Sequence, residues 1–258
     1  MFSECSRLTE APQLPATTLT DYCYASMFSA CTSLTSAPEL PATTLYNSCY
    51  RNMFNSCVNL TSVPELPATT LATGCYYLMF ANCSGLTSAP ELPATTLAKE
   101  CYSAMFYKCE SLTSAPELPA TSLAEKCYAE MFLGCSSLIS APRLPATTLT
   151  NSCYYQMFKD CSDLIIAPIL NAETLVEQCY YEMFSGCYEL SEVIMLATRI
   201  TSTSLTNWLK NVASEGFIYV SNTLYEVATD RDDIDEYRVW NNEYKPRNWQ
   251  WVKYSLYN

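Results

Sequence analysis

Residues 27–52 read MFSACTSLTSAPELPATTLYNSCYRN, and nearly the same 26 residues recur along most of the chain. The Met-Phe pair that opens this stretch occurs eight times without a change in spacing, at Met1-Phe2, Met27-Phe28, Met53-Phe54, Met79-Phe80, Met105-Phe106, Met131-Phe132, Met157-Phe158 and Met183-Phe184. Such a period is typical of a solenoid, in which a repeat too small to bury its own apolar face stacks on its neighbours. The repetition favours a binding surface over an enzyme with a pocket.

The first half of each repeat predicts a short strand. In the second repeat Leu34, Ala37 and Leu40 are expected to point inward, with the polar residues between them facing outward. A proline has no backbone N–H to donate and is poorly suited to the middle of a long central strand. We therefore expect three or four residues of strand that end at Pro38, and a turn at Pro41.

The second half of each repeat predicts an α-helix of about ten residues. Leu45, Cys49 and Met53 follow one another at intervals of four and form an apolar stripe. Thr43 and Thr44 offer hydroxyl groups at the position of an N-cap. A strand, a turn and a helix in each repeat build a right-handed coil with a parallel sheet on one side. The predicted fold is thus an α/β solenoid of eight 26-residue repeats, the architecture of leucine-rich repeats.

The composition is that of a folded and acidic protein. Hydrophobic residues make up 49% of the 258 residues, and the net charge is −12. Residues 1–196 carry 18 acidic and 7 basic side chains, a net charge of −11. An acidic body of this kind repels the phosphates of nucleic acids and anionic lipids, so we exclude both as partners.

Fifteen cysteines form two columns, at the fifth and the twenty-third positions of the repeat. Equivalent residues of stacked strands lie about 4.8 Å apart with parallel Cα–Cβ bonds, whereas a disulfide requires converging Cβ atoms about 3.8 Å apart. The sequence has no Cys-x-x-Cys and no histidine, so the spacing of a zinc site is absent. We expect reduced cysteines that act as small buried hydrophobic residues, and no cofactor or metal.

A column of glutamates is the candidate binding site. Glu39, Glu65, Glu91 and Glu117 hold the thirteenth position in four consecutive repeats, which Arg143, Ile169 and Met195 hold in the next three. Like charges in neighbouring strands repel one another, and attraction of a basic partner is one reason to retain them. The alternative is that glutamate is a surface residue without a function of its own, which was duplicated together with the repeat. The tyrosine and Met-Phe columns are expected in the core, with the tyrosine hydroxyls at its rim.

The two ends of the chain depart from the repeat. The chain starts within a repeat and without a signal peptide, so we expect missing sequence or a partner at the N-terminal end. Near the other end we expect residues 197–204 to insert about four positions, with a domain boundary that separates the solenoid (1–204) from a C-terminal cap (205–258). The predicted cap has one helix over 205–212 and strands over 217–220, 237–240 and 249–254.

Enzymatic activity is not expected. The absence of histidine removes Ser-His and Cys-His dyads, and five glycines provide no loop to hold a phosphate. The segment from Asp230 to Glu236 is rich in acidic residues, but it lacks the glycine and the ligand spacing of an EF-hand loop, and we interpret it as a solvated turn.

The run Phe-x-x-Cys-x-x-Leu-Thr-Ser, followed by a proline-containing apolar stretch and an aromatic pair, resembles the BspA-like leucine-rich repeats of bacterial surface proteins. The resemblance covers residues 1 to about 196. It implies a secreted or surface-attached protein that adheres to matrix proteins or other cells. Related repeats in phage structural proteins imply a virion component as a further role.

Two functions follow from these observations. The first is a non-enzymatic binding or adhesion module that presents its strand face to a protein or glycan. The second is a structural spacer in a surface fibre or virion. The residues of the predicted strand are nearly the same in every repeat, whereas those at positions 3, 4, 6, 7, 20–22, 25 and 26 vary from repeat to repeat. This distribution favours a spacer, or binding along the predicted helical edge.

Overall fold

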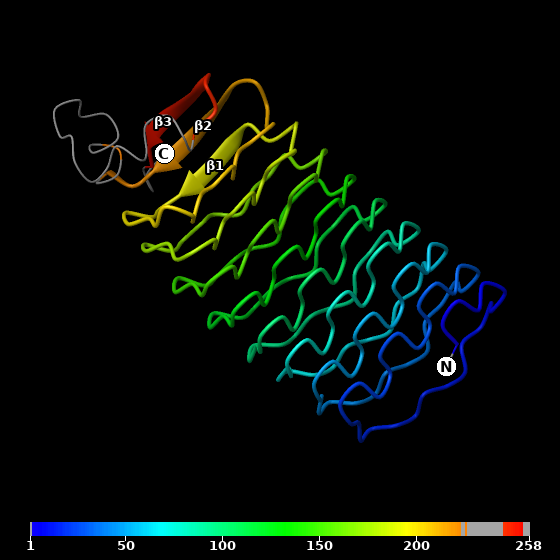
Figure 1. Cartoon of the computed structure of the whole chain (residues 1–258). Helices are drawn as coiled ribbons and strands as arrows, with labels where there is room; N and C mark the ends of the chain where they lie inside the picture. Colours follow the sequence, from blue (N-terminus) through cyan, green and yellow to red (C-terminus); the bar gives the residue numbers. More distant parts are fainter. Residues whose placement is uncertain (1, 223–224, 226–244, 255–258) are drawn as a thin grey trace.

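The chain forms a solenoid of stacked coils, shown by a computed structural model that describes residues 2–222, 225 and 245–254. Figure 1 shows the coils following one another from the N-terminus to the C-terminus. Backbone hydrogen bonds join each coil to the next, for example from the Phe54 N–H to the Met79 carbonyl (2.9 Å) and from the Phe80 N–H to the Met105 carbonyl (2.9 Å). The 26-residue period of the sequence is therefore the length of one coil.

The second half of each coil is a ribbon of turns, and the prediction of a helix there is wrong. Every second N–H donates to a carbonyl three residues earlier, as Met53 does to Tyr50 (3.2 Å). The N–H groups between them donate to the next coil, as Asn52 does to Tyr77 (2.8 Å). A helix satisfies its backbone within one segment, whereas this ribbon shares half of its hydrogen bonds with a neighbouring coil.

Left-handed backbone conformations recur every four residues in the ribbon. Ser48, Asn52 and Ser56 have φ values of 51°, 55° and 63°, and equivalent residues in the other coils behave alike. A residue in this conformation cannot continue a right-handed helix. The non-glycine residues that adopt it include no valine, isoleucine or threonine, whose branched Cβ makes this region costly. The same four-residue interval spaces the buried side chains, whereas an α-helix would rotate them by about 40° at each step.

Prolines keep the strands of most coils short. The described coils up to residue 190 contain isolated parallel bridges, such as Ser88 to Ser114 and Thr96 to Ser122, in place of the predicted strands. Among the described residues, continuous strands occur only near the C-terminal end: β1 (Glu192–Met195), β2 (Gly216–Val220) and β3 (Trp249–Lys253). These form one parallel sheet in the order β1-β2-β3 (Figure 1).

The C-terminal coil is one residue shorter than a repeat, and the predicted insertion of four positions is wrong. Leu170 pairs with Met195, and Glu192 pairs with Phe217, both at an interval of 25 residues. The Phe184 N–H donates to the Trp208 carbonyl. Trp208 thus holds the position that Met183 holds in the preceding coil.

Residues 205–212 belong to this coil. They form turns with left-handed Asn207 and Asn211, so the helix predicted for them is also wrong. The boundary expected between residues 204 and 205 lies inside the coil. The strands predicted at 217–220 and 249–254 are confirmed, and that at 237–240 lies outside the described residues.

The core consists of columns of identical side chains. The phenylalanine rings from Phe2 to Phe184 stack at centroid distances of 5.6 to 5.8 Å. The tyrosine rings from Tyr24 to Tyr180 stack at 5.7 to 6.1 Å. Both columns are buried except at the N-terminal end, which confirms their predicted place in the core. The hydroxyls of Tyr50 and Tyr128 do not reach the rim, since they are buried without a hydrogen-bond partner.

No helix among the described residues has the length and apolar character needed to cross a membrane.

Candidate functional site

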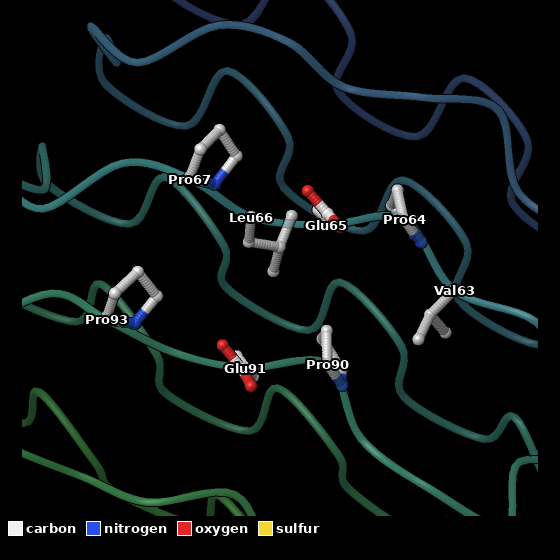
Figure 2. Close-up of a pocket in the computed structure, with 8 residues that line it drawn as sticks. All are labelled: Val63, Pro64, Glu65, Leu66, Pro67, Pro90, Glu91 and Pro93. Atoms are coloured by element: carbon white, nitrogen blue, oxygen red, sulfur yellow. The ribbon is translucent and has the colours of Figure 1, made fainter.

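The glutamate column lies on the outside of the solenoid. Glu39, Glu65, Glu91 and Glu117 are exposed and follow one another in consecutive coils. Each glutamate sits between two prolines of its own coil, and the next residue is a buried leucine. Figure 2 shows Glu65 and Glu91 side by side in adjacent coils. The alternation of an outward glutamate and an inward leucine explains how a short extended segment presents a carboxylate and also contributes to the core.

Shallow grooves run between the proline segments of successive coils. The groove of Figure 2 has a volume of about 380 Å³ and is lined by Val63, Pro64, Glu65, Leu66, Pro67, Pro90, Glu91 and Pro93. Similar grooves of about 420 Å³ and 260 Å³ lie between the coils at Leu14 and Pro38, and between those at Leu92 and Pro116. The proline rings form the apolar walls of the grooves. The exposed carboxylates lie at the open side of each groove. We call this surface the proline face.

The prolines of this face explain why the grooves exist. In each of the first six repeats a pair of prolines removes two N–H donors from the segment, which then cannot form a continuous ladder with the next coil. In these six repeats the bridges lie on either side of the segment, at Ser62 and Thr70 in the coil of Glu65, whereas in the coil of Asn171 a bridge forms within the segment, at Leu170. The segment between the bridges is thus held at both ends and left open between them.

Two members of the sequence column after Glu117 lie as expected, and the third does not. Arg143 and Ile169 are exposed at the same place in their coils. Met195 is fully buried and pairs with Leu170, because the loss of one residue moves it into the leucine column of the core. The acidic part of the proline face is therefore bounded by Gln13 on one side and Arg143 on the other.

The cysteines join neighbouring coils in the core. All fifteen are free thiols, and only Cys5 and Cys23 of the first coil are exposed. In the fifth-position column, each thiol from Cys31 to Cys187 donates to the phenylalanine carbonyl 29 residues earlier, with Sγ to O distances of 3.0 to 3.1 Å. The sequence predicted a buried hydrophobic residue and did not anticipate this hydrogen bond between coils.

Burial also lowers the reactivity of these thiols. It raises the pKa of Cys109 to about 12, against the lowering effect of a hydrogen bond from the backbone of Cys83. The pKa of Cys101 and that of Cys153 are raised to about 12 for the same reason. Since the thiolate is the nucleophile and the metal ligand, a thiol with so high a pKa is inert at neutral pH. In the described part of the chain no group of three or more cysteine or acidic side chains is placed to hold a metal ion.

A second hollow lies on the turn ribbon, where sequence reasoning located the variable letters. Its volume is about 360 Å³. The lining residues are Tyr77, Glu100, Ser103, Lys126, Ala129, Glu130, Ser152, Tyr155 and Gln178. Sequence analysis did not single out these residues. The available signal was the twenty-fifth position, which reads Tyr77, Ser103, Ala129 and Tyr155 in four consecutive repeats.

Comparisons with known proteins give little beyond the repeat itself. No protein-family model and no curated protein matches the chain. Among solved structures, the chain is similar to a leucine-rich repeat protein from Bacteroides ovatus, with 16% identity and a TM-score of 0.32 over 98% of this chain and 80% of that one. At this level of similarity the assignment of a repeat solenoid rests on the hydrogen bonds between coils described above.

Proposed function

We propose that the protein is a non-enzymatic binding module that engages a protein partner along its proline face. The observation that carries the proposal is the regular series of exposed carboxylates at Glu39, Glu65, Glu91 and Glu117 beside grooves with apolar walls. Solenoids commonly use such an extended surface for recognition. The resemblance to BspA-like repeats supports adhesion at a bacterial surface or outside the cell as the context.

The chemistry of the face favours an extended segment that carries basic residues. Coils about 4.8 Å apart place alternate carboxylates about 9.6 Å apart. A polyproline II helix has three residues per turn and a rise of about 3.1 Å per residue, so that every third side chain recurs after about 9.3 Å. Lysine or arginine at every third position of such a segment would meet alternate glutamates, while the residues between them contact the proline rings.

The test compares two sets of four glutamate-to-glutamine substitutions. The first set removes the column, as E39Q/E65Q/E91Q/E117Q. The matched control removes four exposed glutamates elsewhere, as E110Q/E173Q/E177Q/E189Q. Both variants change the net charge from −12 to −8. The probe is a synthetic peptide of repeated Arg-Pro-Pro units, whose binding to each full chain is measured by biolayer interferometry at two salt concentrations.

We expect the column variant to lose at least about tenfold in affinity, equivalent to about 1.4 kcal/mol, and the control to lose far less. The difference should shrink at high salt, because exposed charges are screened. Equal losses in both variants would show that only the net charge matters and would contradict a site on the proline face.

A structural spacer is the second candidate function. It is favoured by the uniformity of the stack, in which phenylalanine and tyrosine columns pass through successive coils with nearly constant ring distances. A spacer predicts no specific binding by the proline face and a rod whose stiffness survives both quadruple substitutions.

A further inference from the structure

The hollow on the turn ribbon arises from a gap in a row of large side chains. The residues at the twenty-fifth position form this row, which we call the outer row: Arg51, Tyr77, Ser103, Ala129, Tyr155 and Tyr181. Their carbonyls each accept a hydrogen bond from the preceding coil, at 2.8 Å for Tyr77 and Ala129 and at 2.7 Å for Tyr155. The row is therefore in register from coil to coil. Ser103 and Ala129 are small and buried, so two coils between Tyr77 and Tyr155 carry no ring.

The two tyrosines that border the gap are supported from outside. The Arg51 guanidinium lies 4.4 Å from the centroid of the Tyr77 ring. At the other end the Tyr155 and Tyr181 rings stack with centroids 4.9 Å apart. Each bordering ring thus has a partner on the side away from the gap, which restricts its movement before any ligand arrives.

Polar groups of both signs surround the gap. Glu100, Lys126, Ser152 and Gln178 come from the twenty-second position of four consecutive coils, and Glu130, at the twenty-sixth position, also lines the hollow. The Ser152 hydroxyl donates to the Gln178 side-chain oxygen at 3.2 Å. Within the described chain, Glu130 has no side-chain hydrogen bond and Lys126 has no ion pair within 4.0 Å. The hollow therefore holds acceptors and donors that are free to bind a ligand.

The Glu130 carboxyl is partly removed from water. Burial raises its pKa, against the lowering effect of Lys126 and Lys159. A half-buried carboxylate without a hydrogen-bond donor is costly, and a ligand hydroxyl that donates to it recovers part of that cost.

We propose that this gap is a binding site for a neutral saccharide. Hydroxyl groups donate and accept, as the mixture of carboxylate, ammonium, amide and hydroxyl groups around the gap requires. An anion would meet Glu100 and Glu130, and a cation would meet Lys126. The tyrosine rings at the two ends offer flat apolar surfaces to the C–H faces of sugar rings. The volume of about 360 Å³ lies within the range of about 300–1,000 Å³ that is usual for small-ligand sites.

This site shares no lining residue with the proline face, and the two can be tested separately. The probes are two neutral disaccharides, cellobiose and maltose, with digalacturonic acid as an anionic analogue. Binding to the full chain is measured by saturation-transfer difference NMR and by titration calorimetry.

Filling the gap provides the decisive variants. Ser103→Tyr and Ala129→Tyr place in the gap a side chain that the same repeat position already carries at Tyr77, Tyr155 and Tyr181, so the coil accommodates it. The matched control is Ser29→Tyr, which adds a tyrosine to the ribbon at the third position, where Tyr107 shows that it fits.

We expect at least one neutral disaccharide to bind in the millimolar range. Ser103→Tyr and Ala129→Tyr should each weaken this binding at least about tenfold, whereas Ser29→Tyr should leave it unchanged. Three results would overturn the proposal: no binding of either neutral probe, binding that survives both gap-filling variants, or equal binding of the anionic analogue.

Discussion

The coils up to residue 190 and the last coils of the described chain solve the same stacking problem with different backbones. In the first region one or two prolines interrupt each extended segment, since the coil of Asn171 keeps only Pro168, and single bridges join neighbouring coils. In the second, β1 and β2 contain no proline, and strands of four and five residues form a continuous sheet. Proline, and not the repeat as such, therefore decides whether this solenoid has strands or grooves.

The core changes together with the backbone. Ser204 and Val212 in the last coil take the places of Cys179 and Cys187. Trp208 and Leu209 take the places of methionine and phenylalanine and are buried like them. The Trp249 indole of β3 donates to the Ala213 carbonyl at 2.8 Å and is also buried, so large aromatic side chains close this end of the core.

Alkaline pH should produce the largest effect, a loss of stability in the region that contains the buried cysteines. Thiols ionise in the unfolded chain near pH 9, whereas burial raises the pKa of Cys101, Cys109 and Cys153 to about 12. The folded state then binds more protons, so the free energy of unfolding should fall by about 1.4 kcal/mol per pH unit and thiol between pH 9 and about 12. Because many coils contribute, we expect cooperative unfolding in this range.

Circular dichroism during urea denaturation at several pH values measures this slope. Cys101→Ala should reduce the slope by about 1.4 kcal/mol per pH unit above pH 9, and Cys5→Ala should leave it unchanged because Cys5 is exposed. A chain that keeps its full stability at pH 11 would contradict the burial of the cysteine columns.

A proline placed in the last coil should break its sheet. β2 is the central strand, so Tyr219→Pro removes a ladder hydrogen bond and should lower the free energy of unfolding by about 3 kcal/mol or more. Tyr219→Ala separates the loss of the side chain from the loss of the N–H. In the other region Pro116→Ala should change stability by less than about 1 kcal/mol. Similar effects of Tyr219→Pro and Tyr219→Ala in chemical denaturation would argue against a central strand.

Substitutions at Lys108 sharpen the distinction between a ribbon of turns and a helix. Lys108 is exposed and has a φ of 54°. In this conformation glycine should be more stable than alanine by about 1 kcal/mol, and valine should be the least stable of the three. A helix would instead favour alanine over glycine by about 1 kcal/mol. The order of the three midpoints of thermal unfolding therefore distinguishes the two structures.

Removal of one hydroxyl should give the smallest effect. The Tyr128 hydroxyl is buried without a hydrogen-bond partner, while its ring stacks on Tyr102 and Tyr154 at 5.8 and 5.9 Å. Tyr128→Phe keeps the stacking and should raise the free energy of unfolding by about 1 kcal/mol. Tyr188→Phe, at an exposed position, serves as the control and should have no effect. Destabilisation by Tyr128→Phe would imply a hydrogen bond to water inside the core.

The sequence revealed the period, the core columns and the exposed glutamates, since each depends only on side chains that recur at a fixed interval. It predicted a helix in place of the ribbon of turns, because an interval of four residues, as from Cys49 to Met53, is also compatible with a helical stripe. The exact four-residue recurrence without the drift to 3.6 was the signal for a ribbon of turns. The last coil was not recognised as a repeat because Trp208 and Leu209 differ from the Met-Phe pair that they replace.

The candidate sites show the same division. Outward glutamates follow from alternation in an extended segment, and the sequence predicted them. The gap between Tyr77 and Tyr155 depends on which side chains from five coils lie in register, and a single repeat contains no sign of it. Pattern analysis within a repeat cannot find a site that is defined by differences between repeats.

Because each coil meets its neighbours through identical rings, thiols and backbone hydrogen bonds, the interface between any two inner coils is nearly interchangeable. Unequal recombination between the encoding repeats that adds or deletes one whole unit leaves every column continuous. Such an event lengthens or shortens the proline face by one carboxylate and one groove, without an intermediate that must refold around a mismatched core. The reach of this surface can thus be inherited as a copy number, independently of the chemistry that each coil presents.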